Sequence, residues 1–217
     1  MVIIKWYGHA CFEIIDSKGR SIVIDPHDGR SIGIKPPKTQ AHAVLITHEH
    51  FDHNAYQGIL RSDGVVYSMK TGKFMVFEHE VLGLKSYHDK VRGRRRGEVV
   101  IYKVNVEGLK IVHLGDLGYI PSDDELKNLI PVDILMTPVG GTFTIDAKEA
   151  LQLSDKLSPK VIIPMHYWVE GINLPLLPLS EFLKLVTTRK IINLESNTWS
   201  VSVMDIPENV VVVFKLM

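Results

Sequence analysis

The sequence is poor in cysteine, in long hydrophobic runs and in net charge. Cys11 is the only cysteine among 217 residues, so no internal disulfide and no cysteine-based zinc finger can form. Metal chemistry in this chain must therefore rest on histidine, aspartate and glutamate. A single thiol also indicates a reducing compartment, and we expect Cys11 to be a small buried hydrophobe in an N-terminal strand.

The hydrophobic runs are too short to cross a bilayer. The longest of them, such as residues 210–214, contain about five apolar residues, whereas a membrane-spanning helix needs roughly 18 or more. Residues 1–7 also lack the basic segment followed by an apolar core that marks a secretory signal. These absences predict a cytoplasmic protein with no membrane partner.

Positive and negative charges balance, with 25 Lys+Arg against 25 Asp+Glu. Broad nucleic-acid binding relies on many Lys and Arg contacts to phosphates, so nucleic acid is a disfavoured partner, although a local basic patch is compatible with the balance. The ten histidines are the unusual feature of the composition, because imidazole is the commonest side chain that binds metals in proteins.

Strand patterns dominate the first half of the chain and alternate with helical patterns in the second half. Short apolar or alternating runs predict strands at 2–6, 11–15, 21–25, 43–47, 65–68, 80–87, 99–106, 110–114, 133–137, 160–165, 190–194, 199–204 and 210–216. Helices are expected at 54–60, 122–129, 147–157 and 180–188. No repeat or Gly/Ser linker divides the sequence, so we expect one α/β domain over residues 1–217 with two sheets.

Three imidazoles and two carboxylates follow the apolar run at 43–47, in the sequence Thr-His-Glu-His-Phe-Asp-His. Side chains alternate along an extended chain, so His48 and His50 point to the same side and can share one metal ion. Asp52 and His53 lie beyond the turn and can reach a second ion. A solvated loop with coincidental histidines is the weaker alternative, because such polar groups are costly at the end of a buried strand unless something binds them.

The pattern His-x-His-x-Asp-His after an apolar strand resembles the signature of the metallo-β-lactamase superfamily. Further matches follow in the expected order: His88 in Tyr-His-Asp, Asp116 in His-Leu-Gly-Asp, and His166 in Ile-Pro-Met-His-Tyr. The resemblance implies a four-layer αββα sandwich, in which helices flank two mixed β-sheets. It also implies one metal ion held by His48, His50 and His88, a second held by Asp52, His53 and His166, and a bridging Asp116.

Several other stretches resemble a compact branch of that superfamily, which includes the ascorbate-phosphate lactonases and many metal-dependent hydrolases. They are residues 8–12, 24–26, 88–97, 113–118 and 138–146. The resemblance covers residues 1 to about 170, with Val99 standing where the branch often has asparagine. Beyond His166 little is recognisable, and the substrate pocket stays unassigned, although we expect the loop at 168–179 to help form it.

This ligand set predicts hydrolysis by a metal-activated water. Two divalent ions about 3.5–4 Å apart can bind one water between them and lower its pKa, so that hydroxide is the nucleophile. The resemblance suggests a catalytic role for Asp52, whose free oxygen would orient that hydroxide. Zinc is the first choice of metal, with manganese or iron as alternatives. The expected reaction is cleavage of a phosphoester or a lactone-type ester in a small anionic substrate.

Neighbouring polar residues are candidates for supporting roles. Metal-bound histidines usually donate their second N–H to a carboxylate or carbonyl, a role that Asp25 could fill, although a turn aspartate is as plausible. His9 and His113 are expected to support the ligands or the fold without binding metal.

Substrate contacts are expected from residues near the proposed metals. In the arginine run after His88, Arg96 is the best candidate for binding an anion, the alternative being a solvated loop. The amides of Gly140 and Gly141 could contact an oxyanion, although a plain turn also explains these glycines.

Three other functions are compatible with parts of the pattern. A di-iron redox protein on the same fold commonly has glutamate at the position of His50 and a flavin domain, and both features are missing here. A nuclease of this type needs an inserted binding region between Asp116 and His166, where this chain is short. A non-catalytic metal-binding module stays open, as does the oligomeric state, including a homo-oligomer.

Overall fold

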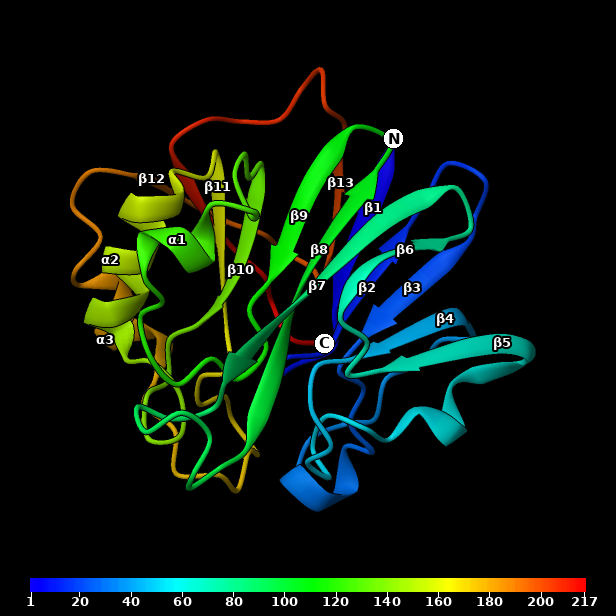
Figure 1. Ribbon diagram of the computed structural model, residues 1–217, viewed down its shortest axis with the longest axis horizontal. Helices are drawn as coiled ribbons and strands as arrows, with labels where there is room; N and C mark the ends of the chain where they lie inside the picture. Colours follow the sequence, from blue (N-terminus) through cyan, green and yellow to red (C-terminus); the bar gives the residue numbers. More distant parts are fainter.

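The computed structural model describes residues 1–217 and contains two mixed β-sheets that pack face to face (Figure 1). Across the first sheet the strand order is β13 (Thr198–Val201), β1 (Val2–Trp6), β2 (Phe12–Ile15), β3 (Ser21–Ile24), β4 (Ala41–Ile46) and β5 (Leu60–Ser68). Across the second it is β12 (Lys190–Asn193), β14 (Val210–Val213), β11 (Val161–Met165), β10 (Ile134–Pro138), β9 (Leu109–His113), β8 (Glu98–Val106), β7 (His79–Tyr87) and β6 (Gly72–Val76).

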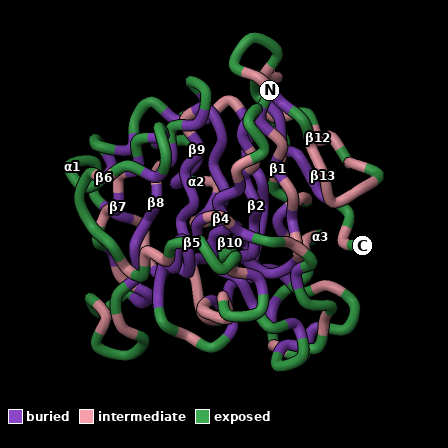
Figure 2. The backbone as a smooth tube through the Cα atoms, turned by 90° about the vertical axis from the view of Figure 1, so that its right-hand side faces the viewer, coloured by how far each residue is buried: buried purple, intermediate pink, exposed green.

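The hydrophobic core lies between the two sheets. It belongs to a cluster of 46 buried residues drawn from both sheets and from the helices, and Figure 2 shows the strands buried at the centre and the connecting loops exposed around them. In β1 the buried side chains of Val2, Ile4 and Trp6 alternate with half-buried ones, as expected for a strand with one face on the core. Strands β3, β10 and β11 are buried along their whole length, which explains their continuous apolar sequences.

The three α-helices, α1 (Asp123–Leu126), α2 (Ala147–Leu157) and α3 (Leu179–Leu183), lie beside the second sheet (Figure 1). Helix α2 has the bounds that the sequence predicts. Its first turn is closed by a capping box, in which Asp146 and Glu149 each accept a hydrogen bond from the other's backbone amide. Neither helix α1 nor helix α3 extends as far as expected. The α/β sandwich of two mixed sheets is confirmed, and no helix has the length and apolarity that a membrane span requires.

The helix expected at 54–60 is wrong. Only a short 3-10 helix, Tyr56–Gly58, forms there, and another, Arg30–Ile32, precedes β4. The reason is that the chain returns to the sheet at once: the Ala41 amide donates to the carbonyl of Ile59, and Leu60 pairs with Ala41. Strand β6 was not expected from the sequence either, and it forms an antiparallel hairpin with β7.

Strand directions bring several loops to one end of the sandwich. In the first sheet β1, β3 and β4 run in the same direction, and in the second β7, β9 and β11 do so. The segments that follow these six strands carry the polar side chains singled out in the sequence. Topology therefore places residues that are far apart in the chain at neighbouring strand ends.

Candidate metal centre

Seven side chains predicted as metal ligands meet at this end of the sandwich. They leave the carboxyl ends of four strands: His48, His50, Asp52 and His53 follow β4, His88 follows β7, Asp116 follows β9, and His166 follows β11. All of them except the half-buried His50 are buried. Each half of the chain thus supplies part of one polar centre.

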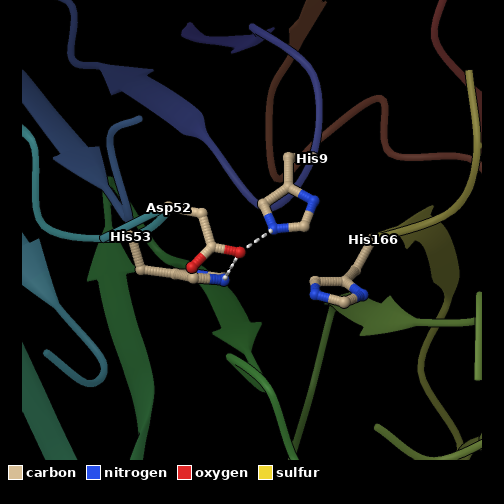
Figure 3. A group of neighbouring side chains, drawn as sticks. All are labelled: His9, Asp52, His53 and His166. Atoms are coloured by element: carbon tan, nitrogen blue, oxygen red, sulfur yellow. Dashed lines mark hydrogen bonds and ion pairs between the residues drawn. The ribbon is translucent and has the colours of Figure 1, made fainter. Parts of the chain in front are cut away.

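The donor atoms form two neighbouring groups. His48, His50 and His88 offer ligand atoms that lie within 4.8 Å of one another. A second group with the same spacing contains Asp52, His53 and His166, together with His9 (Figure 3). These are the two sets expected from the sequence, with His9 as an addition to the second.

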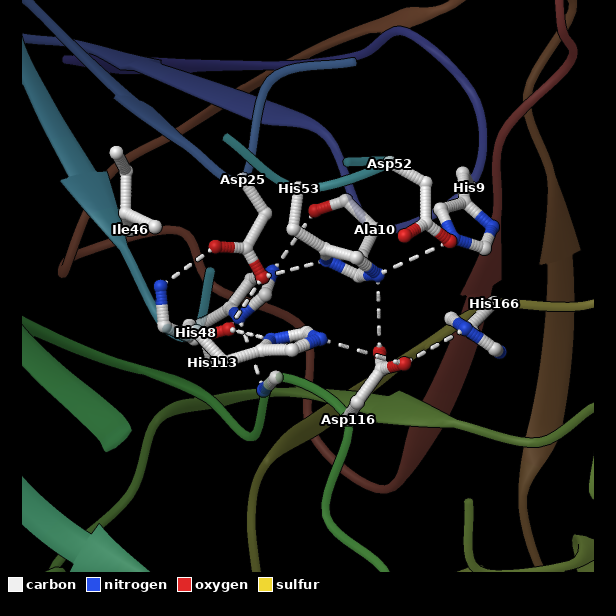
Figure 4. A network of polar contacts seen from close by, with 12 residues as sticks. His9, Ala10, Asp25, Ile46, His48, Asp52, His53, His113, Asp116 and His166 are labelled. Carbon is white, nitrogen blue, oxygen red and sulfur yellow. Dashed lines mark hydrogen bonds and ion pairs between the residues drawn. The ribbon is translucent and has the colours of Figure 1, made fainter. Parts of the chain in front are cut away.

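The carboxylate of Asp116 lies between the imidazoles (Figure 4). Its Oδ2 atom is 3.0 Å from Nε2 of His166 and 3.3 Å from Nε2 of His88, and its Oδ1 atom is 3.4 Å from Nε2 of His53. His48 approaches the same carboxylate at 3.9 Å. Asp116 therefore contacts histidines of both groups, as a bridging carboxylate must.

Asp25 orients His53 directly and His48 through Thr47, on the side of each imidazole that faces away from Asp116. Its Oδ2 atom accepts a hydrogen bond from Nδ1 of His53 at 3.0 Å and another from the hydroxyl of Thr47 at 2.6 Å. The Thr47 hydroxyl in turn lies 3.0 Å from Nδ1 of His48 and accepts its proton. Both imidazoles thus direct a free Nε2 toward Asp116, and the supporting role considered for Asp25 has a structural basis. The sequence did not predict this role of Thr47. The available signal was its hydroxyl side chain directly before the first histidine of the motif.

Six buried polar atoms at the centre have no hydrogen-bond partner: Nδ1 of His9, His88 and His166, Nε2 of His48 and His53, and Oδ1 of Asp116. Burial holds the pKa of His48 well below its ordinary value. Burial raises the pKa of Asp116, but the imidazoles of His166 and His53 outweigh it and hold that pKa well below the usual range. Imidazole nitrogens around a buried carboxylate are the donor set that a divalent transition metal takes, so these residues fit metal ions.

His9 is tied to the second group by its side chain and its backbone. Its Nε2 atom donates to Oδ2 of Asp52 at 3.1 Å, and its ring centroid is 4.2 Å from that of His166. The His9 carbonyl accepts hydrogen bonds from the amide of His166 and the indole of Trp6, both at 3.1 Å. The turn between β1 and β2 therefore fixes two members of the centre at once.

His113 supports the loop that carries Asp116. Its Nε2 atom donates to the carbonyl of Ala10 at 2.9 Å, and its Nδ1 atom accepts the amide of Gly115 at 3.1 Å. Both ring nitrogens are occupied, which fits the expectation that His113 binds no metal. It links the two sheets and holds the residue that precedes Asp116.

Gly140 has a different role from the one expected. Its amide donates to the carbonyl of His166 at 3.1 Å, so it is not free to contact an oxyanion. A Cβ atom at this position would lie 2.2 Å from that same carbonyl oxygen, and glycine is therefore needed for the close approach of the His166 loop. Gly141 lies in the same turn and does not line the cavity beside the metal ligands.

That cavity has a volume of about 270 Å³. Its walls are His50, Phe51, Asp52, His88, Arg96, Asp116, Phe143 and Leu174. Arg96 therefore lies beside the candidate ligands, as expected for a residue that binds an anionic substrate. Leu174 belongs to the loop at 168–179, which contributes to the cavity as predicted, whereas Phe143 carried no recognisable signal. Cys11 is buried directly before β2 in a small apolar cluster and does not line this cavity.

Comparisons with known proteins agree with this geometry. The family model described as "Beta-lactamase superfamily domain" matches residues 3–166, a span that includes every member of the centre. A "UPF0173 metal-dependent hydrolase" from Thermococcus onnurineus is 32% identical over 193 residues, covering 77% of this chain and 85% of that protein.

Solved structures show the same fold. A Thermotoga maritima protein, described as a proposed Zn-dependent hydrolase of the metallo-beta-lactamase superfamily, has a TM-score of 0.78 and 32% identity, covering 99% of this chain and 98% of that one. CmlA, a diiron beta-hydroxylase from Streptomyces venezuelae, has a TM-score of 0.58 and 13% identity, covering 76% of this chain and 44% of that one. The second likeness concerns the fold alone.

Proposed function

Because this chain belongs to the beta-lactamase superfamily domain family and is a metal-dependent hydrolase, we propose that it uses two divalent metal ions to hydrolyse a small anionic ester. The first ion would be held by His48, His50 and His88. The second would be held by Asp52, His53 and His166, with Asp116 between the two. The observation that carries the proposal is the convergence of histidines from both donor groups on the Asp116 carboxylate.

Two divalent ions at such a centre, zinc in the first instance, supply a water of lowered pKa and polarise the bond to be cleaved. Manganese and iron are the alternatives to zinc.

Asp52 is the candidate residue for orienting the attacking water. Burial raises the pKa of its carboxyl, but the hydrogen bond from His9 and the nearby His53 outweigh it and leave that pKa well below the ordinary value. A carboxylate that stays charged at neutral pH can accept a hydrogen bond from water and so orient its attack. No serine or cysteine nucleophile is required, because a metal-activated water would be the nucleophile, and the only thiol, Cys11, is fully buried.

The size of the neighbouring cavity supports a small substrate. Its volume of about 270 Å³ is at the lower end of ligand pockets, and its walls combine Arg96 with the apolar side chains of Phe51, Phe143 and Leu174. The resemblance to the ascorbate-phosphate lactonase branch supports a phosphoester or lactone-type ester as the bond. The single buried thiol supports a cytoplasmic location, because cysteines stay reduced in that compartment.

His50 favours hydrolysis over redox chemistry on this fold. The half-buried imidazole packs against His48 and His88, with ring centroids 4.6 Å and 5.1 Å away, as a third nitrogen ligand to one metal. Di-iron redox proteins of the same fold commonly have glutamate there.

Chelation followed by metal restoration tests the proposal. The wild-type protein is expected to take up two zinc ions per chain, measured by mass spectrometry of the metals, and to hydrolyse members of a panel of phosphodiesters, lactones and thioesters. His48→Ala and His166→Ala should each lose metal and activity, whereas His42→Ala, a half-buried histidine outside the centre, should keep both. Full metal content and activity in His48→Ala would overturn the assignment, and full metal content in the wild type without turnover would indicate a non-catalytic module.

A further inference from the structure

The loop after His88 is built around the carboxylate of Asp89. Oδ1 of Asp89 accepts the amides of Val91 at 2.8 Å and Gly93 at 2.9 Å, and Oδ2 accepts the amides of Arg95 at 2.9 Å and Arg96 at 2.8 Å. Four hydrogen bonds from one side chain fix the backbone of this loop. They also use the charge of Asp89 on backbone amides, so that it does not pair with the neighbouring guanidinium groups.

The loop concentrates positive charge, although the net charge of the whole protein is zero. Lys90, Arg92, Arg94, Arg95 and Arg96 lie within seven consecutive residues. Lys90 pairs with Glu149, but the four arginines form no ion pair with an acidic side chain. Their guanidinium groups are therefore available for an anion from outside the chain.

Arg95 and Arg96 line a second cavity, of about 500 Å³, next to the metal centre. It shares His88, Arg96 and Phe143 with the smaller cavity over the ligands, so the two spaces meet at these side chains. The guanidinium carbon of Arg96 lies 4.4 Å from the centroid of the Phe143 ring. This contact between a cation and an aromatic face holds Arg96 at the junction.

We propose that the cavity at Arg95 and Arg96 is a subsite for an oxyanion, a phosphate or a carboxylate, that the substrate carries at a distance from the bond cleaved. The inference rests on the proposed function, because a substrate that reaches the metals through the smaller cavity passes Arg96 and Phe143. Paired N–H groups of arginine match the geometry of either anion. The carboxylate of Asp89 also lines the cavity, but its oxygens already accept four backbone amides and form no ion pair with the arginines. The volume restricts the ligand to a small molecule.

Binding of stable anions to the metal-loaded protein tests the subsite. The probes are phenylphosphonate and benzoate, with benzyl alcohol as the uncharged control, and affinity is measured by calorimetric titration. The double variant R95A/R96A should bind the anion at least about tenfold more weakly than wild type, since it loses charge-assisted hydrogen bonds. The matched variant R92A/R94A removes the same charge from the same loop outside the cavity, and it should lose less than about threefold.

The ratio of the affinities of the two double variants measures the contribution of Arg95 and Arg96, because any contact of the probe with metal is common to both variants. The probe with the larger ratio identifies phosphate or carboxylate as the preferred group, and R96K should fall between wild type and R95A/R96A, because lysine keeps the charge but not the paired donors. Equal losses in the two double variants, or no loss in either, would overturn the subsite. Failure of the proposed function is separate: it would appear as absent metal or absent turnover in the wild type.

Discussion

Nδ1 of His53 lies 3.0 Å from Oδ2 of Asp25, and neither side chain is exposed to solvent. A buried carboxylate is costly unless it is fully hydrogen-bonded, and Asp25 accepts from the amide and hydroxyl of Thr47 as well as from His53. The carboxylate thus fixes the side of the imidazole that carries the proton. The other side is left for a metal ion.

Replacing Asp25 with asparagine should weaken metal binding by about 10- to 100-fold, the usual effect of losing a carboxylate behind a metal-bound histidine. Asparagine keeps the shape of the side chain but loses its charge. Competition with a chelator of known affinity measures the change. Asp28→Asn, an exposed aspartate nearby that accepts from Ser31, is the control and should bind metal normally. Unchanged affinity in Asp25→Asn would show that His53 is oriented by other contacts.

Thr47→Val should lower metal affinity in the same assay, because valine removes the hydroxyl that connects Nδ1 of His48 with Asp25. Thr47→Ser keeps that hydroxyl and should retain most of the affinity. A valine variant that binds metal as tightly as the serine variant would contradict the role assigned to the hydroxyl.

His9→Ala should lower the hydrolytic rate by about tenfold or more, since Asp52 loses the hydrogen bond that holds its Oδ2 atom. His9→Gln can still donate from its amide and should recover part of the rate. Metal content is measured in parallel, and a loss confined to the second ion would identify His9 as support for that ion's ligands. Wild-type rate and metal content in His9→Ala would remove His9 from the mechanism.

Gly118→Ala should disturb the centre through the backbone of the neighbouring loop. A Cβ atom at Gly118 would lie 2.3 Å from the amide nitrogen of Asp89 and 2.3 Å from the carbonyl carbon of His88, so the backbone must shift. We expect a loss of about 1–3 kcal/mol in the free energy of unfolding, together with weaker metal binding by His88. Gly58→Ala, where a Cβ atom meets nothing within 4 Å, is the control for adding a methyl group.

Glu78 should contribute stability that is lost in acid. It pairs with Arg20, which also pairs with Asp16, and the hydrogen bond from Arg20 lowers the pKa of Glu78 from 4.5 to about 2. A carboxyl whose pKa is depressed by folding stabilises the folded protein above pH 4.5, and that contribution disappears as the pH falls through 2. Urea unfolding at pH 5 and pH 3 should therefore show a smaller decrease for Glu78→Gln than for wild type. Identical decreases would mean that Glu78 titrates normally in the folded protein.

The sequence predicted the parts of the fold that depend on local patterns. Continuous apolar runs such as that of β4 and the capping residues of α2 carry their own signals, and these elements lie where expected. The helix at 54–60 failed because pairing between β4 and β5 overrides local preference at Ile59. Such pairing joins residues that are distant in sequence, and no local pattern reveals it.

The candidate ligands could be predicted from residue type and order in the sequence, but the residues that surround and support them could not. The functions of Thr47, Asp89 and Phe143 arise from contacts that exist only after folding: a hydroxyl between two side chains, a carboxylate inside its own loop, and an aromatic ring beneath an arginine. Gly140 illustrates the converse. The sequence indicates a glycine whose amide could contact a ligand, whereas in the structure that amide donates to the carbonyl of His166.

Strand β11, which leads to His166, has β10 on one side and β14 on the other, and β14 is the last strand of the chain. Translation proceeds from the amino end, so all seven candidate ligands are synthesised before residues 210–213. Until then β11 has one open edge. The strand that leads to His166 is therefore fully paired only after synthesis of β14.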